Sequence, residues 1–137
     1  MSMLKIKSVL TLVLSLFTFA VFAGATPQIS QQDLITAFNK GAANMVILDV
    51  RSADEYQHGH IAGAINMSYD TVEENLSQLT QYKKSTLVVY CRSGRRAGIA
   101  EHILSSNGFN DIRHLTGDMN SWVEAKLPVV NNKPAHK

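Results

Sequence analysis

The feature that most constrains the fold is a short apolar run at residues 86–90, which leads directly into the only cysteine of the chain, Cys91. The run is β-branched and aromatic and too short for a helix, which is typical of a buried strand. Apolar residues then recur at helical spacing over residues 95–105, and Asn107-Gly108 provides a stop signal. We therefore predict a strand, a turn that carries Cys91, and a helix.

Three arginines follow Cys91 within five residues: Arg92, Arg95 and Arg96. The start of a helix presents unpaired N–H groups and the positive end of the helix dipole, and both favour an anion. Helix N-termini and neighbouring cations also favour the thiolate form of a cysteine. A lone cysteine is most often a small buried hydrophobic residue, but such a residue is not ordinarily followed by this arginine-rich turn. We therefore predict a reactive thiolate beside an anion-binding turn, with at least one arginine directed to solvent.

The N-terminal part has the pattern of a secretory signal peptide. Two lysines precede an uncharged, apolar run over residues 8–25 that ends in the small residues AGA. Its most apolar part, residues 9–22, is short for a membrane span of about twenty residues. We therefore expect residues 1–25 to be a signal peptide that is cleaved before Thr26, with no stable membrane association afterwards. The protein is expected to be exported, and periplasmic if its source is a Gram-negative bacterium.

Length and charge indicate one nearly neutral domain. The 137 residues suit a single globular unit over residues 26–137, with a core at about 29–125 and a polar, little-structured tail from Pro128. Without residues 1–25 the chain has eleven basic and eleven acidic residues, which gives no broad basic face and no nucleic-acid partner. One cysteine cannot form an internal disulfide, so its retention in an oxidising compartment favours a chemical role.

Strand-like and helix-like segments alternate along the chain. Expected strands are residues 28–29, 45–50, 64–67, 86–90 and 111–115, and expected helices are residues 31–40, 52–58, 71–79, 95–105 and 119–124. This alternation predicts an α/β domain with a central, mostly parallel sheet of about five short strands flanked by helices. Ligands bind beyond the carboxyl ends of the strands in such sheets, which is where we expect Cys91.

A polar cluster follows the second predicted strand. His58 and His60 flank a glycine, a spacing that does not match the sets that bind zinc well, so we predict no metal site. We interpret Asp49 and Arg51 as structural ion pairs or caps, and His60 as the source of a hydrogen bond that fixes a loop. We assign no role to His114, which lies near the end of a predicted strand.

The distance from Cys91 to the last arginine bears on the chemistry. Cysteine-dependent phosphatases have a loop that resembles Cys-x5-Arg, whereas here Ala97 occupies that position and Arg96 closes a loop one residue shorter. A smaller ring of N–H groups is expected to suit a persulfide sulfur better than a full phosphoryl group. Phosphatase or arsenate reductase chemistry is therefore an alternative to persulfide chemistry.

Three segments resemble a known family. The segment from Cys91 to Arg96 resembles the Cys-x-x-Gly-x-Arg active-site loop of single-domain rhodaneses, and residues 48–66 are similar to the upstream signature of that family. Residues 115–122 are similar to its closing Gly-Gly-x-x-x-Trp segment, although Asp118 replaces the usual second glycine. That replacement leaves the shape of the local turn open.

The resemblance implies a single rhodanese-like domain with sulfurtransferase activity. Cys91 would attack the outer sulfur of thiosulfate, release sulfite and hold a persulfide that a thiophilic acceptor, such as cyanide or a thiol, removes. Its partners would be this small-molecule donor and acceptor, and neither a cofactor nor a metal is needed. A non-enzymatic persulfide carrier or binding module is a further alternative. The catalytic residue would be Cys91, and the substrate would be bound by the rest of the loop: Arg92, Ser93, Gly94, Arg95 and Arg96.

Overall fold

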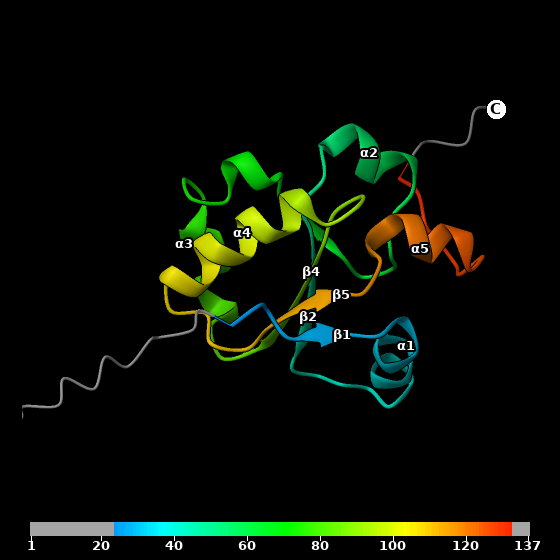
Figure 1. Ribbon diagram of the computed structural model, residues 1–137, viewed down its shortest axis with the longest axis horizontal. Coiled ribbons are helices and arrows are strands. Elements are labelled where there is room, and N and C mark those ends of the chain that lie inside the picture. The colour runs from blue at the N-terminus through cyan, green and yellow to red at the C-terminus, as the bar shows by residue number, and fades with distance from the viewer. Residues whose placement is uncertain (1–23, 133–137) are drawn as a thin grey trace, which may run out of the picture.

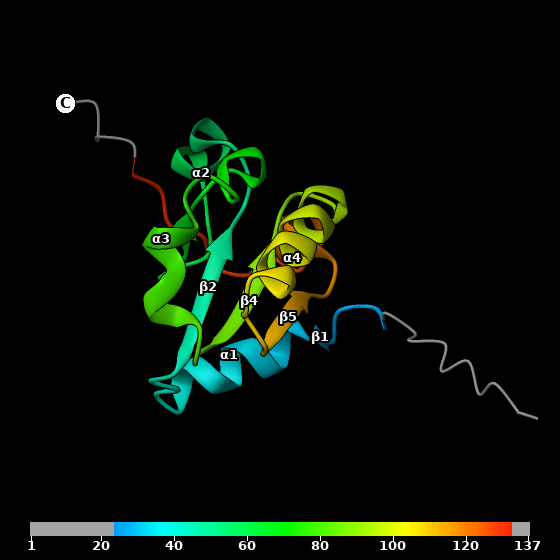
Figure 2. The same ribbon diagram turned by 90° about the vertical axis from the view of Figure 1, so that its left-hand side faces the viewer.

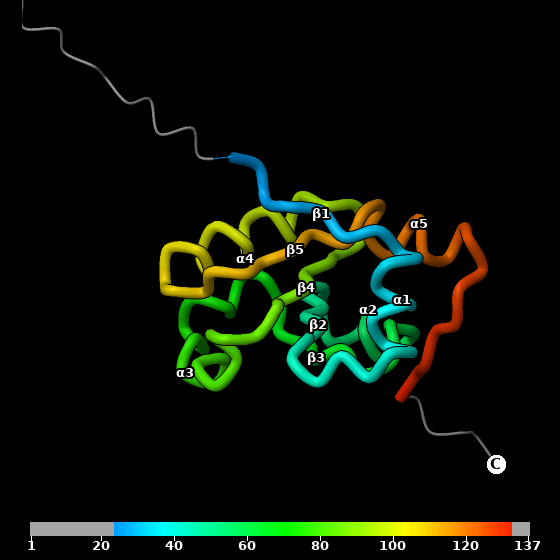
Figure 3. The backbone as a smooth tube through the Cα atoms, turned by 90° about the horizontal axis from the view of Figure 1, so that it is seen from below, coloured from blue at the N-terminus to red at the C-terminus, as the bar shows by residue number. Residues whose placement is uncertain are grey.

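The computed structural model describes residues 24–132 and contains one five-stranded sheet. Its strands are β1 (Gln28–Ile29), β2 (Met45–Asp49), β3 (Ile65–Asn66), β4 (Thr86–Tyr90) and β5 (Ile112–Leu115). All pair in parallel in the order β1-β5-β4-β2-β3, as the tube in Figure 3 shows. The predicted α/β class and the five short strands are confirmed. The predicted signal peptide falls almost wholly on residues 1–23, outside the described part, and stays a prediction.

Helices cover both faces of the sheet. They are α1 (Gln31–Asn39), α2 (Ala53–His58), α3 (Leu76–Leu79), α4 (Arg95–Ser106) and α5 (Asp118–Glu124), with 3-10 turns η1 (Tyr69–Thr71) and η2 (Thr80–Tyr82). Helices α3 and α4 lie on one side of the sheet, and α1 and α5 lie on the other (Figures 1 and 2). Within residues 24–132 no helix has the length and apolar character that a bilayer crossing requires.

The sheet divides the core into two clusters, and the side chains of strand β4 contribute to both. Leu87 and Val89 belong to the cluster beneath α4, whereas Val88 and Tyr90 belong to the cluster beneath α1 and α5. All four side chains are fully buried, because β4 lies between β2 and β5 and has helices on both sides. A strand that is covered on both faces requires a continuous apolar sequence, and β4 has one.

Helix starts follow the serine caps in the sequence. Ser30 accepts a hydrogen bond from the Asp33 N–H at the start of α1. Ser52 and Glu55 form a reciprocal capping box at the start of α2, in which each side chain accepts a bond from the other residue's N–H. These side chains satisfy N–H groups that have no partner within the helix.

The continuous helix predicted over residues 71–79 does not form. Its N-terminal part is a turn, and only α3 at its end is α-helical. Asn75 stands at the break, and its side-chain amide donates to the Thr71 carbonyl at 2.8 Å. The Asn75 N–H also donates to that carbonyl, at 3.1 Å, but the Asn75 backbone has a φ of −112° and a ψ of 18°. These angles depart from helical values, so the helix is interrupted at Asn75 despite the apolar spacing.

The tail predicted from Pro128 is ordered where it is described. Val130 pairs with His60 in an antiparallel bridge, with N–H to carbonyl distances of 2.8 and 2.9 Å. Trp122, which is buried, donates from its indole to the Pro128 carbonyl at 2.9 Å. The segment up to residue 132 therefore packs back onto the domain instead of leaving it.

Asp49 and Arg51 form a buried ion pair, as the sequence analysis predicts. The Arg51 guanidinium donates to both Asp49 oxygens, the shortest contact being 2.6 Å, and to the Gly59 carbonyl at 2.7 Å. The Tyr90 hydroxyl donates to Asp49 Oδ2 at 2.6 Å and accepts from the Ile61 N–H at 3.2 Å. Burial, reinforced by the charge of Asp49, raises the pKa of Tyr90, so this hydroxyl remains a donor.

Removal of the Tyr90 hydroxyl should therefore destabilise the fold. Tyr90→Phe leaves the buried Ile61 N–H without its acceptor, which costs about 1–3 kcal/mol of unfolding free energy. Urea denaturation measures this loss. Tyr82→Phe is the matched control, since no hydrogen bond of the Tyr82 hydroxyl is found in the described part of the chain, and equal effects of the two changes would contradict the assigned role.

Candidate active site

Cys91 stands at the carboxyl end of β4, four residues before α4 begins. The alternation along β4 directs its side chain to the α4 side, with Leu87 and Val89. The residue is only 1% exposed. The predicted strand, turn and helix are confirmed, and the thiol lies beneath the turn instead of on the outer surface.

The turn after Cys91 holds an N–H group against the sulfur. The Gly94 N–H donates to Cys91 Sγ at 3.0 Å. Gly94 has a φ of 112°, in the left-handed region that favours glycine. The carbonyls of Cys91 and Arg92 accept from the N–H groups of Met119 and Asn120 in α5, so the turn is fastened to the next helix while Gly94 faces the thiol.

Arg96 is engaged by Glu55, the carboxylate that also takes part in the capping box of α2. Its two terminal nitrogens donate to the two Glu55 oxygens at 2.7 and 2.9 Å. Hydrogen bonding from Arg96 is the main cause that lowers the pKa of Glu55 to about 2. The pair joins the start of α4 to α2, and the predicted substrate role of Arg96 competes with it.

The other residues of the loop are more open. Arg92 and Ser93 are exposed, and Arg92 lines a pocket. Arg95 is also exposed, and its guanidinium lies 5.9 Å from the centre of the Tyr69 ring, within cation–π range. The three arginines therefore have three different surroundings, and Arg92 is the one beside the pocket.

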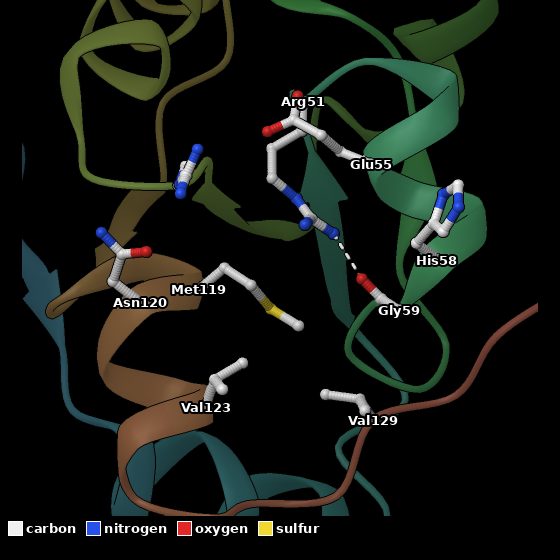
Figure 4. Close-up of a pocket in the computed structure, with 9 residues that line it drawn as sticks. Arg51, Glu55, His58, Gly59, Met119, Asn120, Val123 and Val129 are labelled. Atoms are coloured by element: carbon white, nitrogen blue, oxygen red, sulfur yellow. Dashed lines mark hydrogen bonds between the residues drawn. The ribbon is translucent and has the colours of Figure 1, made fainter.

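The pocket beside the loop has a volume of about 400 Å³. Met119, Val123 and Val129 give it an apolar wall, and Arg92 brings positive charge to it. Arg51 also lines it, but its guanidinium is paired with Asp49. Figure 4 shows the Met119 side chain reaching into the space between Arg51 and Val129. The remaining lining residues are Glu55, His58, Gly59 and Asn120. The contribution of Val129 was missed because its segment was interpreted as a tail.

A second buried group, also missed, lies below the turn. Asp118 Oδ1 accepts from the Cys91 N–H at 2.9 Å, and Asp118 Oδ2 lies 2.9 Å from His114 Nε2. The other ring nitrogen of His114 contacts Glu101. Asp118 has a φ of 55°, so it adopts the left-handed backbone open to a glycine. The one available signal for this group in the sequence was that Asp118 replaces the second glycine of the family's closing segment.

Two further predictions concern the role of His60 and the presence of a metal site. His60 Nδ1 lies 2.8 Å from the Tyr56 carbonyl, which fixes the loop as expected. Within residues 24–132, no group of three histidine, cysteine, aspartate or glutamate side chains is arranged to hold a metal ion.

His114 should make stability depend on pH. Hydrogen bonds with Asp118, and next with Glu101, raise the pKa of His114 to about 10 from its ordinary value of 6.5. Its contribution to stability is then fully present below about pH 6.5 and is lost as the pH rises to about 10. We expect the difference in unfolding free energy between the wild type and His114→Gln to shrink over this range.

Denaturation at several pH values measures this difference. His102→Gln is the matched control, since His102 is exposed and has no ion pair in the described region. A difference for His114→Gln that stays constant from pH 6.5 to pH 10 would contradict the protonated state of His114.

Comparisons with known proteins agree with this geometry. The model of the rhodanese-like domain family matches residues 30–125. A thiosulfate sulfurtransferase of Escherichia coli K12 is 37% identical over 70 residues, covering 51% of this chain and 67% of that protein. A thiosulfate:glutathione sulfurtransferase of Saccharomyces cerevisiae is 30% identical over 105 residues, covering 69% and 76%.

Solved structures give the same assignment. The crystal structure of a rhodanese-related protein from Thermoplasma volcanium has a TM-score of 0.66 and 31% sequence identity, with 76% of this chain and 97% of that one covered. The family match spans the strands and helices that build the Cys91 turn. The chain therefore belongs to the rhodanese-like domain family.

Proposed function

We propose that the protein is a thiosulfate sulfurtransferase that carries sulfur as a persulfide on Cys91. The observation that carries this proposal is the Gly94 N–H directed at Cys91 Sγ, in a turn with an exposed arginine beside a pocket. A fixed donor aimed at sulfur stabilises negative charge on a thiolate. Membership in a family with named sulfurtransferases supports the same activity.

The reaction divides into two displacements. The Cys91 thiolate attacks the outer sulfur of thiosulfate, the sulfur–sulfur bond of thiosulfate breaks, and sulfite leaves with the electron pair. A thiophilic acceptor then attacks the outer sulfur of the persulfide and regenerates the Cys91 thiolate. The Gly94 N–H is placed to stabilise sulfur-centred charge on Cys91 between the two steps.

Arg92 is the residue we assign to the incoming anion. It is exposed, lines the pocket and adjoins Cys91 in sequence. Arg96 has both terminal nitrogens on Glu55, which favours an anchoring role. The same engagement weighs against phosphatase or arsenate reductase chemistry, because an arginine fork holds phosphate with the nitrogens that Glu55 occupies here.

The acceptor would enter from the pocket. The apolar wall of Met119, Val123 and Val129 suits an acceptor with some aliphatic surface, so we propose a thiol in preference to cyanide as the natural acceptor. From the pattern at residues 1–25 we also propose that the protein acts after export.

The activity is tested by thiocyanate formation from thiosulfate and cyanide. Wild-type protein should show multiple turnovers, and Cys91→Ser should fall to background because the chain has no other thiol. Activity that survives in Cys91→Ser would refute the proposal. A persulfide that forms but never turns over would instead support a carrier, and hydrolysis of an aryl phosphate or turnover of arsenate would support the other alternative.

Arg92→Ala tests the anion role. Loss of one charge-assisted contact should lower kcat/KM for thiosulfate by roughly tenfold or more, while the fold is retained since Arg92 is exposed. Arg113→Ala is the matched control: Arg113 is a partly exposed arginine that pairs with Asp111 and does not line this pocket. An equal loss in both variants would contradict the assignment.

A further inference from the structure

A buried chain of charged groups lies below the Cys91 turn, and sulfur transfer as described above does not use it. Its members come from three elements: Glu101 from α4, His114 from β5 and Asp118 from the start of α5. Glu101 and Asp118 are buried, and the His114 side chain is 12% exposed. Buried carboxylates are costly unless they are fully paired, so the arrangement needs an explanation.

The two side-chain contacts of His114 suit a protonated imidazole, which has two N–H donors. Both nitrogens of the His114 ring face carboxylate oxygens, one from Glu101 and one from Asp118. Carboxylates only accept hydrogen bonds, so both ring nitrogens must carry protons. Asp118 in turn accepts from two donors, His114 and the Cys91 N–H, with a different oxygen for each. An asparagine has one acceptor oxygen, so it keeps both contacts only if its amide nitrogen donates to a His114 ring that has lost one proton.

The same carboxylate supports the far end of the turn. A Cβ atom built on Gly94 would lie 3.2 Å from Asp118 Oδ2 and 3.6 Å from His114 Nε2. The aspartate–histidine pair therefore fills the space beside Gly94 that a side chain would occupy. Because the Gly94 N–H donates to Cys91 Sγ, the residue that carries the thiol is bonded to Asp118 and the residue that donates to the thiol lies beside it.

We propose that Asp118, held by the protonated His114, is a positioning residue for the Cys91 turn. It fixes the Cys91 N–H and supports Gly94, so that the Gly94 N–H stays aimed at the sulfur through both half-reactions. Asp118 does not line the pocket, so it acts through the turn and makes no contact with the anion. The consequence for catalysis rests on the proposed sulfurtransferase function, whereas the positioning itself does not.

Two variants separate charge from backbone shape. Asp118→Asn keeps the size of the side chain but removes one acceptor, and Asp118→Gly removes the side chain while it suits the left-handed backbone. Asp111→Asn is the matched control, an aspartate in an ion pair with Arg113, away from the turn. Glu101→Gln weakens the hold on His114 and leaves Asp118 in place.

Amide hydrogen exchange measures the positioning without any substrate. In Asp118→Asn and Asp118→Gly we expect exchange at Gly94, which has no hydrogen bond to Asp118, to accelerate by roughly tenfold or more. The amides of Val88 and Val89 in β4 serve as the reference for global opening. Exchange at Gly94 that stays at the wild-type rate in both variants would overturn the proposal.

Persulfide formation measures the consequence for catalysis. The maximal rate with saturating thiosulfate should fall by roughly tenfold in the Asp118 variants, with the half-saturating concentration changed by less than about twofold. A purely structural role would instead give a smaller fraction of active protein with an unchanged rate constant, and that result would contradict the positioning role.

These experiments distinguish failure of the sulfurtransferase proposal from failure of the proposed role of Asp118. If wild-type protein forms no persulfide, the sulfurtransferase function fails, and the exchange rates still decide the role of Asp118. If an Asp118 variant unfolds, the β4 amides lose protection together with Gly94, and Glu101→Gln then decides the question. Faster exchange confined to the turn in Glu101→Gln supports the proposal, and wild-type exchange there contradicts it.

Discussion

The structure depends on the alternation of side chains along β4, a strand buried on both faces. Leu87 and Val89 face α4, and this alternation gives Cys91 the same side. The thiol therefore lies where the strand ends and where α4 begins. A shift of register by one residue would turn Cys91 toward α1 and α5 and separate it from the Gly94 N–H. The apolar packing of the strand thus sets the position of the Cys91 thiol.

An ion pair and a hydrogen bond then hold the turn from two sides. Glu55 holds Arg96 at the first turn of α4, and Asp118 holds the Cys91 N–H from below. Each contact joins elements that are far apart in sequence, so the loop is a rigid junction of α2, α4 and α5 despite its exposed arginines. A loop held in this way places its donors before the substrate arrives, which reduces reorganisation during the reaction.

Local patterns account for what could be predicted. The strand–turn–helix around Cys91, the serine caps and the parallel sheet all follow from spacings of a few residues, and the Asp49–Arg51 pair follows from position at a strand end. The contacts of Glu55 and His114 were not predictable in this way, because their partners depend on how separate elements pack. The prediction of a helix over residues 71–79 was wrong because the backbone leaves helical angles at Asn75, which a count of apolar spacing does not detect.

The central claim is that Cys91 carries sulfur. Its most direct test is intact-mass spectrometry of the protein after incubation with thiosulfate, followed by peptide mapping. The account predicts the addition of one sulfur atom, located on Cys91, and its removal on addition of a thiol or cyanide. Protein that keeps its original mass with thiosulfate, or that gains sulfur at a site other than Cys91, would contradict the account.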